Sequence, residues 1–353
     1  MKRLGSAVFL AIFFLFLALP GFGFLWNLPY PADGAQTFEQ WAEANIWFRD
    51  AFISLHGRLN QEVFGESGHP QVIMGEDGWF FFSETMDDFF RRETMSGSQI
   101  HALSDFLDGL SVALKAEGIG MTVLIAPNKN TIYPEKMTRH ARQGKGESNL
   151  ERVQVALAAR SVNVLDAQAL LLANKGQGFL YHKTDTHWNA LGALIVYREL
   201  MGRIAHGSMN ENSRHAYNGS AYEKYEDIIW REDAAFSGDL ARLSLSVMYG
   251  GKHTETSLVP ELERGYRVQG VMRSLSDMTI RTESDANDLR VLMLRDSFGD
   301  ALFPYLANNV GQLTYARDMR VDVEDIARQG YMHVVIEVAE RSLTGLLERL
   351  EMK

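Results

Sequence analysis

The sequence contains no cysteine. This absence excludes disulfide bridges, thiolate metal ligands and a cysteine nucleophile, although it does not fix the cellular compartment. Basic residues are also few: 35 lysines and arginines stand against 45 aspartates and glutamates, which gives a formal net charge of −10. No dense basic run offsets this balance, so nucleic acid is not an expected partner.

What is present is typical of a folded domain. The 353 residues are 46% hydrophobic and 23% charged, which is enough to bury a sizeable core. The sequence has no internal repeat, no low-complexity tract and no obvious linker after Pro31. We therefore expect one domain over residues 30–353, preceded by a separate N-terminal segment over residues 1–29.

That N-terminal segment has the composition of a membrane segment. Lys2 and Arg3 precede an apolar run over residues 4–28, which is long enough to cross a bilayer with its basic end in the cytoplasm. A cleavable signal peptide is the alternative, but residues 18–21 give no convincing cleavage site. Both interpretations place residues 30–353 outside the cytoplasmic membrane. We expect a periplasmic domain anchored to the inner membrane.

Apolar periodicity predicts alternating helices and strands. Short apolar runs between breakers are typical of strands buried on both faces, so we expect an α/β fold with a parallel sheet covered by helices. The helix that begins at Trp188 should have Asp185 or Thr184 near its N-cap. Helices are expected over residues 37–63, 98–117, 149–160, 167–173, 188–204, 302–306, 322–328 and 343–350. Strands are expected over 121–126, 162–165, 289–294, 312–316 and 334–338, with a hairpin over 72–82, an irregular segment over 206–235 and edge strands within 258–288.

The first candidate for chemistry is the pair Asp185 and His187. On an extended or turn backbone, residues two apart point the same way, so Asp185 can bind one ring nitrogen of His187 and leave the other free to take a proton. Two alternatives stay open. His187 could be a buried core histidine, or His182, Asp185 and His187 could bind zinc, although no further ligand is evident.

The second candidate is Ser297, which lies just after the strand predicted over 289–294 and before a helix. Backbone N–H groups converge at such a junction and would stabilise an oxyanion. In a combined site, Asp185 orients His187, His187 takes the proton of Ser297, and Ser297 carries an acyl group. The alternative is that Ser297 only caps the helix.

Residues 184–189 with Gly192, followed by residues 296–298 after a hydrophobic strand, resemble the AlgX/AlgJ-like polysaccharide O-acetyltransferases, whose domain is similar to SGNH hydrolases. The resemblance spans about residues 35–345. It implies an SGNH hydrolase-like α/β fold with a circularly permuted order, in which the catalytic Asp and His precede the serine. Further motifs agree in order at residues 48–52 with Arg58, 75–81, 126–135, 238–240 and 337–341.

The resemblance also implies a function. Asp185, His187 and Ser297 would transfer an acetyl group, received from a membrane-bound O-acyltransferase, to an exported polysaccharide, without a cofactor or a metal ion. The membrane-anchored AlgJ type is the closer match, because the chain leaves no room for the carbohydrate-binding module of AlgX. One alternative is an acetyl esterase with the same three residues. The other is a non-catalytic scaffold or carbohydrate-binding subunit of a polysaccharide export complex, in which Ser297 is only a cap. The net charge of −10 weakly disfavours the anionic polymer alginate as acceptor.

Three further residues are candidates for binding substrate. Lys129 and Tyr133 lie in a motif of the resembled family, although a purely structural role fits them equally well. Arg295 stands where that family usually has a small residue before the Asp-Ser pair. This departure leaves the detail of the turn at Ser297 open.

Overall fold

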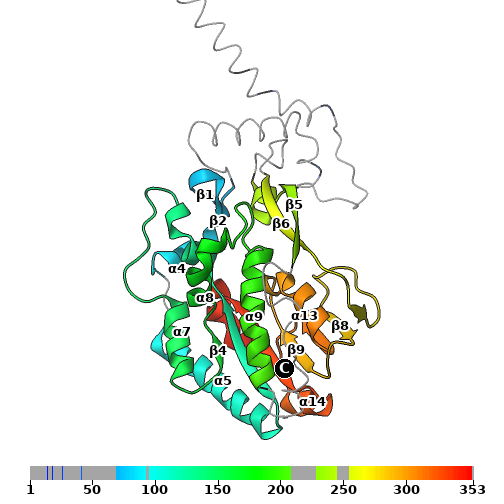
Figure 1. The fold of residues 1–353 in the computed structure, drawn as a ribbon. Coiled ribbons are helices and arrows are strands. Elements are labelled where there is room, and N and C mark those ends of the chain that lie inside the picture. Colours follow the sequence, from blue (N-terminus) through cyan, green and yellow to red (C-terminus); the bar gives the residue numbers. More distant parts are fainter. Residues whose placement is uncertain are drawn as a thin grey trace, which may run out of the picture. The chain divides into compact units, whose positions relative to one another are not determined.

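The computed structural model describes residues 69–92, 95–207, 228–244 and 254–351, with the single positions 14, 18, 26 and 41. The chain divides into two compact units, Gln71–Ala241 with His253–Lys353, and Met1–Pro70 with Arg242–Lys252. The unit of Gln71–Ala241 with His253–Lys353 holds nearly all described residues (Figure 1). No helix within the described ranges combines the length and apolarity needed to cross a bilayer. Apart from those single positions, the segment predicted over 1–29 and the helix predicted over 37–63 lie outside the described ranges and stay predictions.

The centre of this unit is a seven-stranded sheet with the order β4-β3-β11-β9-β10-β8-β7. Its first five strands are mutually parallel, as predicted, whereas β8 and β7 add an antiparallel edge in the region where edge strands were expected. The strands are β3 (Gly120–Ala126), β4 (Val164–Leu165), β7 (Tyr266–Val268), β8 (Thr279–Ser284), β9 (Arg290–Leu294), β10 (Gln312–Ala316) and β11 (His333–Ala339).

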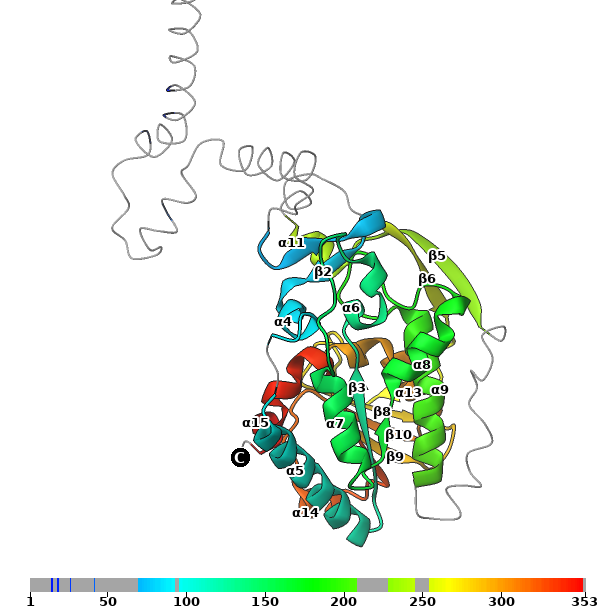
Figure 2. The ribbon, with the colours of Figure 1, turned by 90° about the vertical axis from the view of Figure 1, so that its left-hand side faces the viewer.

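Helices cover both faces of the sheet (Figures 1 and 2). One face packs against α5 (Gly97–Ala116), α7 (Asn149–Ala158), α14 (Val323–Arg328) and α15 (Leu346–Glu351). The other packs against α8 (Ala167–Asn174), α9 (Ala190–Gly207) and α13 (Phe303–Asn309). Successive side chains of β3 alternate between the two cores, and every residue of β11 is buried. This explains why the central strands read as unbroken apolar runs.

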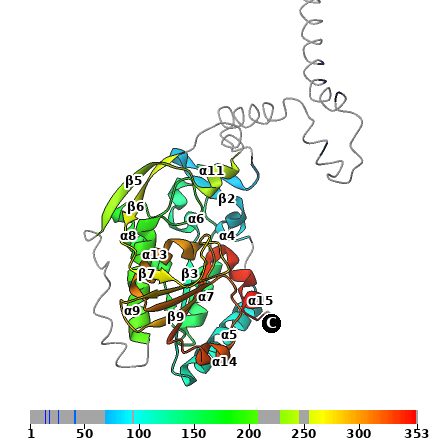
Figure 3. The same cartoon turned by 90° about the vertical axis from the view of Figure 1, so that its right-hand side faces the viewer.

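Two small antiparallel sheets lie at one end of this unit (Figures 1 and 3). One is the predicted hairpin of β1 (Val72–Met74) and β2 (Phe80–Phe82), whose turn places Asp77 and Gly78 at positive φ. The other pairs β5 (Ile229–Phe236) with β6 (Glu255–Glu261). Short helices also occur at α4 (Met86–Phe89), α6 (Lys129–Ile132) and α11 (Asp239–Leu243). Short 3-10 turns occur at Glu76–Gly78, Ser83–Thr85, Pro134–Lys136, Lys175–Gln177, Phe298–Ala301 and Glu340–Gly345.

The structure corrects two expectations. The segment predicted to be irregular over 206–235 includes strand β5, while residues 208–227 lie outside the described ranges. Its pattern was missed because β5 has no buried residue and owes its conformation to pairing with β6. The cap of α9 also lies later than expected. Oδ1 of Asn189 accepts the N–H groups of Leu191 and Gly192, both at 3.0 Å, whereas the carboxylate of Asp185, which was expected near the N-cap, accepts from His187 and Asp239 instead.

Candidate active site

The segment after β9 is fixed by Asp296. Its carboxylate accepts the N–H of Phe298 at 2.9 Å and the N–H of Ala339, at the end of β11, at 2.7 Å. Its own N–H donates to Oε2 of Glu337 at 3.0 Å. These bonds join the turn after β9 to the neighbouring parallel strand. They hold Ser297 at the carboxyl end of the sheet, half-buried and just before the turn Phe298–Ala301.

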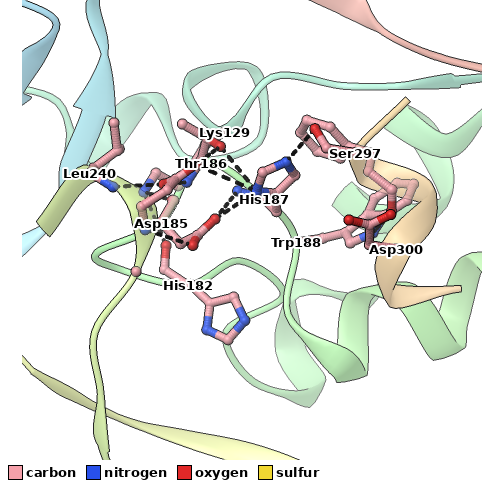
Figure 4. A network of polar contacts seen from close by, with 12 residues as sticks. Lys129, His182, Asp185, Thr186, His187, Trp188, Leu240, Ser297 and Asp300 are labelled. Atoms are coloured by element: carbon pink, nitrogen blue, oxygen red, sulfur yellow. Dashed lines mark hydrogen bonds and ion pairs between the residues drawn. The ribbon is translucent and has the colours of Figure 1, made fainter. Parts of the chain in front are cut away.

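The structure brings the three predicted triad residues together (Figure 4). Nε2 of His187 lies 2.8 Å from Oγ of Ser297, and Nδ1 of the same ring lies 2.7 Å from Oδ1 of Asp185. Ser297 makes no side-chain cap bond in its own turn. Its hydroxyl therefore faces the imidazole, and the helix-cap interpretation finds no supporting bond.

A second carboxylate, on Asp239, supports the same loop. The Asp239 N–H donates to Oδ2 of Asp185 at 2.8 Å, while its carboxylate accepts the N–H and the hydroxyl of Thr186 at 2.8 and 2.6 Å. Sequence reasoning gave Asp239 no role. The signal was present, since Gly238-Asp239-Leu240 is one of the motifs of the resembled family, but its partner lies more than 50 residues earlier in the chain.

Gly238 allows this approach. A Cβ at that position would lie 2.4 Å from Cβ of Asp185 and 2.4 Å from the carbonyl oxygen of Thr184. The Gly238 N–H donates to the hydroxyl of Thr184 at 3.1 Å. Only glycine fits between these atoms, so the start of α11 can reach the carboxylate of Asp185.

Asp185 is ionised in this setting. It is only 8% exposed, and burial alone would raise its pKa. The hydrogen bond from His187 and the backbone N–H groups of Asp239 and His187 outweigh that effect, so the pKa of Asp185 lies well below its usual range. An anionic Asp185 fixes the proton of His187 on Nδ1, which leaves Nε2 free to accept the proton of Ser297.

The residues that could ligate zinc in the structure differ from those expected from the sequence. Donor atoms of Asp185, His187 and Asp239 lie within 4.8 Å of one another, whereas His182 is not among them. The Nδ1 atom and the carboxylate oxygens of this group already face protein donors or acceptors. His182 is turned toward Glu255, with Nδ1 3.7 Å from Oε1. The arrangement is therefore suited to orienting the imidazole rather than to ligating a metal.

Lys129 holds the backbone of the loop that carries Asp185. Its Nζ donates to three backbone carbonyls, those of His182 and Lys183 at 3.0 Å and that of Asp185 at 2.6 Å. Burial lowers the pKa of Lys129 to about 7, against the opposing effects of nearby carboxylates, Asp185 first among them. Its ammonium protons are directed at the backbone, so the geometry gives Lys129 a positioning role.

Tyr133 and Arg295 also lie inside the packing. Tyr133 is 3% exposed, and its hydroxyl accepts the N–H of Leu180 at 2.9 Å. Arg295 is fully buried and donates to the carboxylate of Asp300 and the carbonyl of Leu275. Neither offers surface to a substrate in this structure. Both side chains hold segments around the site in place, and their contacts with substrate stay a prediction.

Trp188 ties the two halves of the site together. Its indole Nε1 donates to the carbonyl of Phe298 at 2.9 Å, and the His187 ring lies 4.8 Å from the Phe298 ring. Trp188 follows the histidine and Phe298 follows the serine. The contact therefore fixes the distance between the base and the nucleophile, although they stand 110 residues apart.

The family model described as "SGNH hydrolase-like domain, acetyltransferase AlgX" matches residues 72–263, which is more than half of the chain. The chain belongs to this family. The matched range includes Asp185, His187 and Asp239, and it ends before Ser297. The pairing of the imidazole with Ser297 thus comes from the geometry, independently of the AlgX family match.

The curated relatives that match this chain are AlgJ proteins. The probable alginate O-acetylase AlgJ of Pseudomonas aeruginosa is 26% identical over 189 residues, which cover 53% of this chain and 46% of that protein. The AlgJ protein of Pseudomonas fluorescens is 28% identical over 154 residues, or 43% and 38% of the two chains. The chain thus spans about half the length, or less, of the curated relatives it matches.

Solved structures confirm the SGNH hydrolase-like α/β fold. PatB1 of Bacillus cereus, solved with a sulfonyl adduct, matches with a TM-score of 0.59 and 17% identity over 80% of this chain and 98% of that one. The O-acetyltransferase domain of Pseudomonas putida AlgJ matches with a TM-score of 0.51 and 18% identity, over 78% and 92%. At these identities the likeness establishes the fold.

Proposed function

We propose that this protein is a serine-dependent O-acetyltransferase that acts on a polysaccharide. The observation that carries the proposal is the unbroken hydrogen-bond chain from Asp185 through His187 to Oγ of Ser297. Membership of a family described by an acetyltransferase supports the same activity. The triad is defined by geometry and roles, so its order along the chain does not matter.

The chemistry proceeds in two halves. Ser297 Oγ attacks the acetyl carbonyl carbon of the donor while Nε2 of His187 takes its proton, and the donor leaves with that proton. A sugar hydroxyl then loses its proton to His187 and attacks the acetyl-serine, which restores the Ser297 hydroxyl. Asp185 stays ionised throughout and stabilises the imidazolium.

The acceptor we propose is a hydroxyl of an exported polysaccharide. The AlgJ relatives are named as probable alginate O-acetylases, which supports a polysaccharide acceptor for this chain. A net charge of −10 would repel an anionic polymer, so a neutral polysaccharide is the favoured acceptor.

The donor we propose is a membrane-bound O-acyltransferase, with the domain in the periplasm and residues 1–29 in the inner membrane. The support is Lys2 and Arg3 before the apolar run over residues 4–28. An alkaline phosphatase fused after residue 353 should be active in cells. An inactive but intact fusion would contradict this location.

The activity is tested with the purified full chain and an activated acetyl ester, following acetyl-enzyme by peptide mass and ester cleavage by absorbance. We expect wild type to acetylate at Ser297, and Ser297→Ala and His187→Ala each to lose activity by several orders of magnitude. Ser276→Ala, at an exposed serine, is the matched control and should behave as wild type. An inert wild type, or active Ser297→Ala, would favour the scaffold interpretation.

A second measurement separates transfer from hydrolysis. Acetyl-enzyme is mixed with neutral oligosaccharides, and acetylated sugar and free acetate are both quantified. Acetylated sugar that increases with acceptor concentration, at the expense of acetate, is the expected result. Acetate as the sole product, whatever the acceptor, would make the protein an esterase.

A further inference from the structure

Glu255, to which the sequence gave no role, binds the backbone just before Asp185. Its carboxylate, on the first residue of β6, accepts the N–H of Lys183 at 2.7 Å. It also accepts the N–H and the hydroxyl of Thr184, both at 3.1 Å. The Glu255 side chain is 11% exposed, so these bonds form largely out of water. A carboxylate has acceptor sites for all three donors, whereas a neutral amide would turn donors of its own toward them.

Lys129, on α6, binds the carbonyls of the same loop. The three protons of its ammonium match three acceptors, which are backbone carbonyls within residues 182–185. The Lys129 side chain is buried, and its Nζ lies 5.6 Å from the centre of the Trp79 ring and 5.2 Å from that of the Phe81 ring. The donors of the loop therefore meet a negative charge and its acceptors meet a positive one.

The two charges also stabilise each other. The charged and titratable groups that face Lys129 are the carboxylates of Asp185, Glu255 and Asp239 and the imidazole of His182. Burial lowers the pKa of Lys129 to about 7, and the three carboxylates oppose that effect. Removing the charge of Glu255 should therefore lower the pKa of Lys129 further. The ammonium and the carboxylate are coupled across the loop that both of them bind.

We propose that Glu255 and Lys129 form a pair of positioning residues, which hold residues 182–185 between opposite charges and thereby aim the Asp185 carboxylate at His187. This assignment rests on the proposed acetyl transfer. Both side chains act through the loop backbone rather than on the reacting atoms. The contact that depends on them is the 2.7 Å bond between Oδ1 of Asp185 and Nδ1 of His187, which orients the ring toward the nucleophile. A misplacement of about 1 Å at such a contact can lower the rate about 10²-fold.

The pair should also limit activity at alkaline pH. Deprotonated Lys129 keeps two N–H donors and turns a lone pair toward the third carbonyl, which would loosen the loop. The contribution of Lys129 should therefore be complete below its pKa of about 7 and lost as the pH rises through that value. The triad responds in the opposite direction, because His187 must be unprotonated to accept the proton of Ser297. We expect kcat to fall on the alkaline side, and we assign this fall to Lys129.

The test measures kcat and KM for ester cleavage by the full chain over a pH series on both sides of neutrality. We expect Glu255→Gln to lower kcat about 10²-fold with little change in KM. Its alkaline fall should begin at lower pH than in wild type, because the ammonium has lost a neighbouring carboxylate. Glu255→Asp keeps the charge and should leave the alkaline fall at the wild-type pH. Lys129→Gln should remove the alkaline fall, because an amide does not titrate.

Glu261→Gln is the matched control. Glu261 is the last residue of β6 and is exposed, whereas Glu255 is the first residue of the same strand. The control variant should equal wild type in kcat, in KM and in the pH at which activity falls. Unfolding midpoints of all variants, measured in parallel, separate a displaced loop from a loss of the fold.

Four results would overturn the assignment or its basis in distinguishable ways. Wild-type kcat in Glu255→Gln would remove Glu255 and leave the proposed function intact. A lower kcat in this variant, with a lower unfolding midpoint and the alkaline fall unmoved, would give Glu255 a structural role alone. An alkaline fall that persists in Lys129→Gln would belong to another group and would remove Lys129. A wild type that forms no acetyl-Ser297 would remove the proposed function and this assignment together.

Discussion

Two buried carboxyl groups near Ser297 carry opposite protonation states. Asp185 is ionised because it accepts hydrogen bonds from His187 and Asp239. Glu337 is fully buried, and burial, with nearby Asp296, raises its pKa well above the usual value. Glu337 is therefore neutral, and its Oε2 accepts the N–H of Asp296. A neutral carboxyl can sit beside the anionic side chain of Asp296 without repulsion.

Glu337→Gln should therefore keep both stability and turnover close to wild type, because an amide has the shape and donor capacity of a protonated carboxyl. Glu337→Ala leaves the buried N–H of Asp296 unpaired and should cost about 1–3 kcal/mol of unfolding free energy. Urea unfolding and ester cleavage measure both effects. If Gln were as harmful as Ala, Glu337 would be ionised in the folded protein.

Residue by residue, the sequence predicted the local part of the site. The spacing of Asp185 and His187 and the strand-to-turn position of Ser297 carry their own signal, because each depends on neighbours in the chain. Asp239 differs, because its motif over residues 238–240 shows no local reason for a role. Its importance comes from the atoms it meets across the fold, those of Asp185 and Thr186.

At the level of elements, β11 is joined to β3 through a buried histidine. His333 is fully buried, and its Nε2 lies 2.9 Å from the hydroxyl of Thr122 on β3. A Cβ on Gly120 would lie 2.4 Å from Nδ1 of His333, so the ring fills the space beside a strand that has no side chain there. Burial lowers the pKa of His333 to about 4, which keeps the ring neutral.

This strand contact should fail in acid. In the unfolded state His333 has a pKa of about 6.5, whereas in the folded state its pKa is about 4. As the pH falls below 6.5 the unfolded state takes up a proton that the folded state does not, so the free energy of unfolding is highest above pH 6.5 and decreases toward pH 4. The expected loss is about 3 kcal/mol, from about 1.4 kcal/mol per pH unit. Urea unfolding at several pH values should show a shallower acid loss in His333→Gln. Equal slopes would exclude His333 as the cause.

Strands that are buried on both faces of the sheet could be predicted from the sequence. The runs of β3, β9 and β11 are apolar at nearly every position, and the capping boxes of α5 and α7 mark where those helices begin. Strand β5 was missed because it has no buried residue, so its sequence shows no apolar face. Its strand conformation comes from pairing with β6, which a local pattern does not record.

On the scale of the whole molecule, charge should govern the choice of polymer. A net charge of −10 repels a polyanion at low ionic strength, and salt screens that repulsion beyond about 10 Å at 0.1 M. We expect acetylation of an anionic polysaccharide to speed up several-fold as salt is raised, while a neutral polymer of equal length shows no change. Rates of acetyl transfer at several salt concentrations measure this. A rate that falls with salt for the polyanion would reveal a basic binding surface.

The position of β11 has a consequence for the newly made chain. Strands β3 and β4 reach β9 and β10 only through β11, which pairs with both β3 and β9 and comes last of the described strands in the sequence. The loop with the base and the turn with the nucleophile therefore belong to halves of the sheet that one late segment joins. A ribosome-bound chain that has not yet released β11 has every triad residue but lacks the strand that joins the two halves of the sheet, so we expect it to be inactive. Ester cleavage by nascent chains of increasing length should begin abruptly, at the length that frees residue 339.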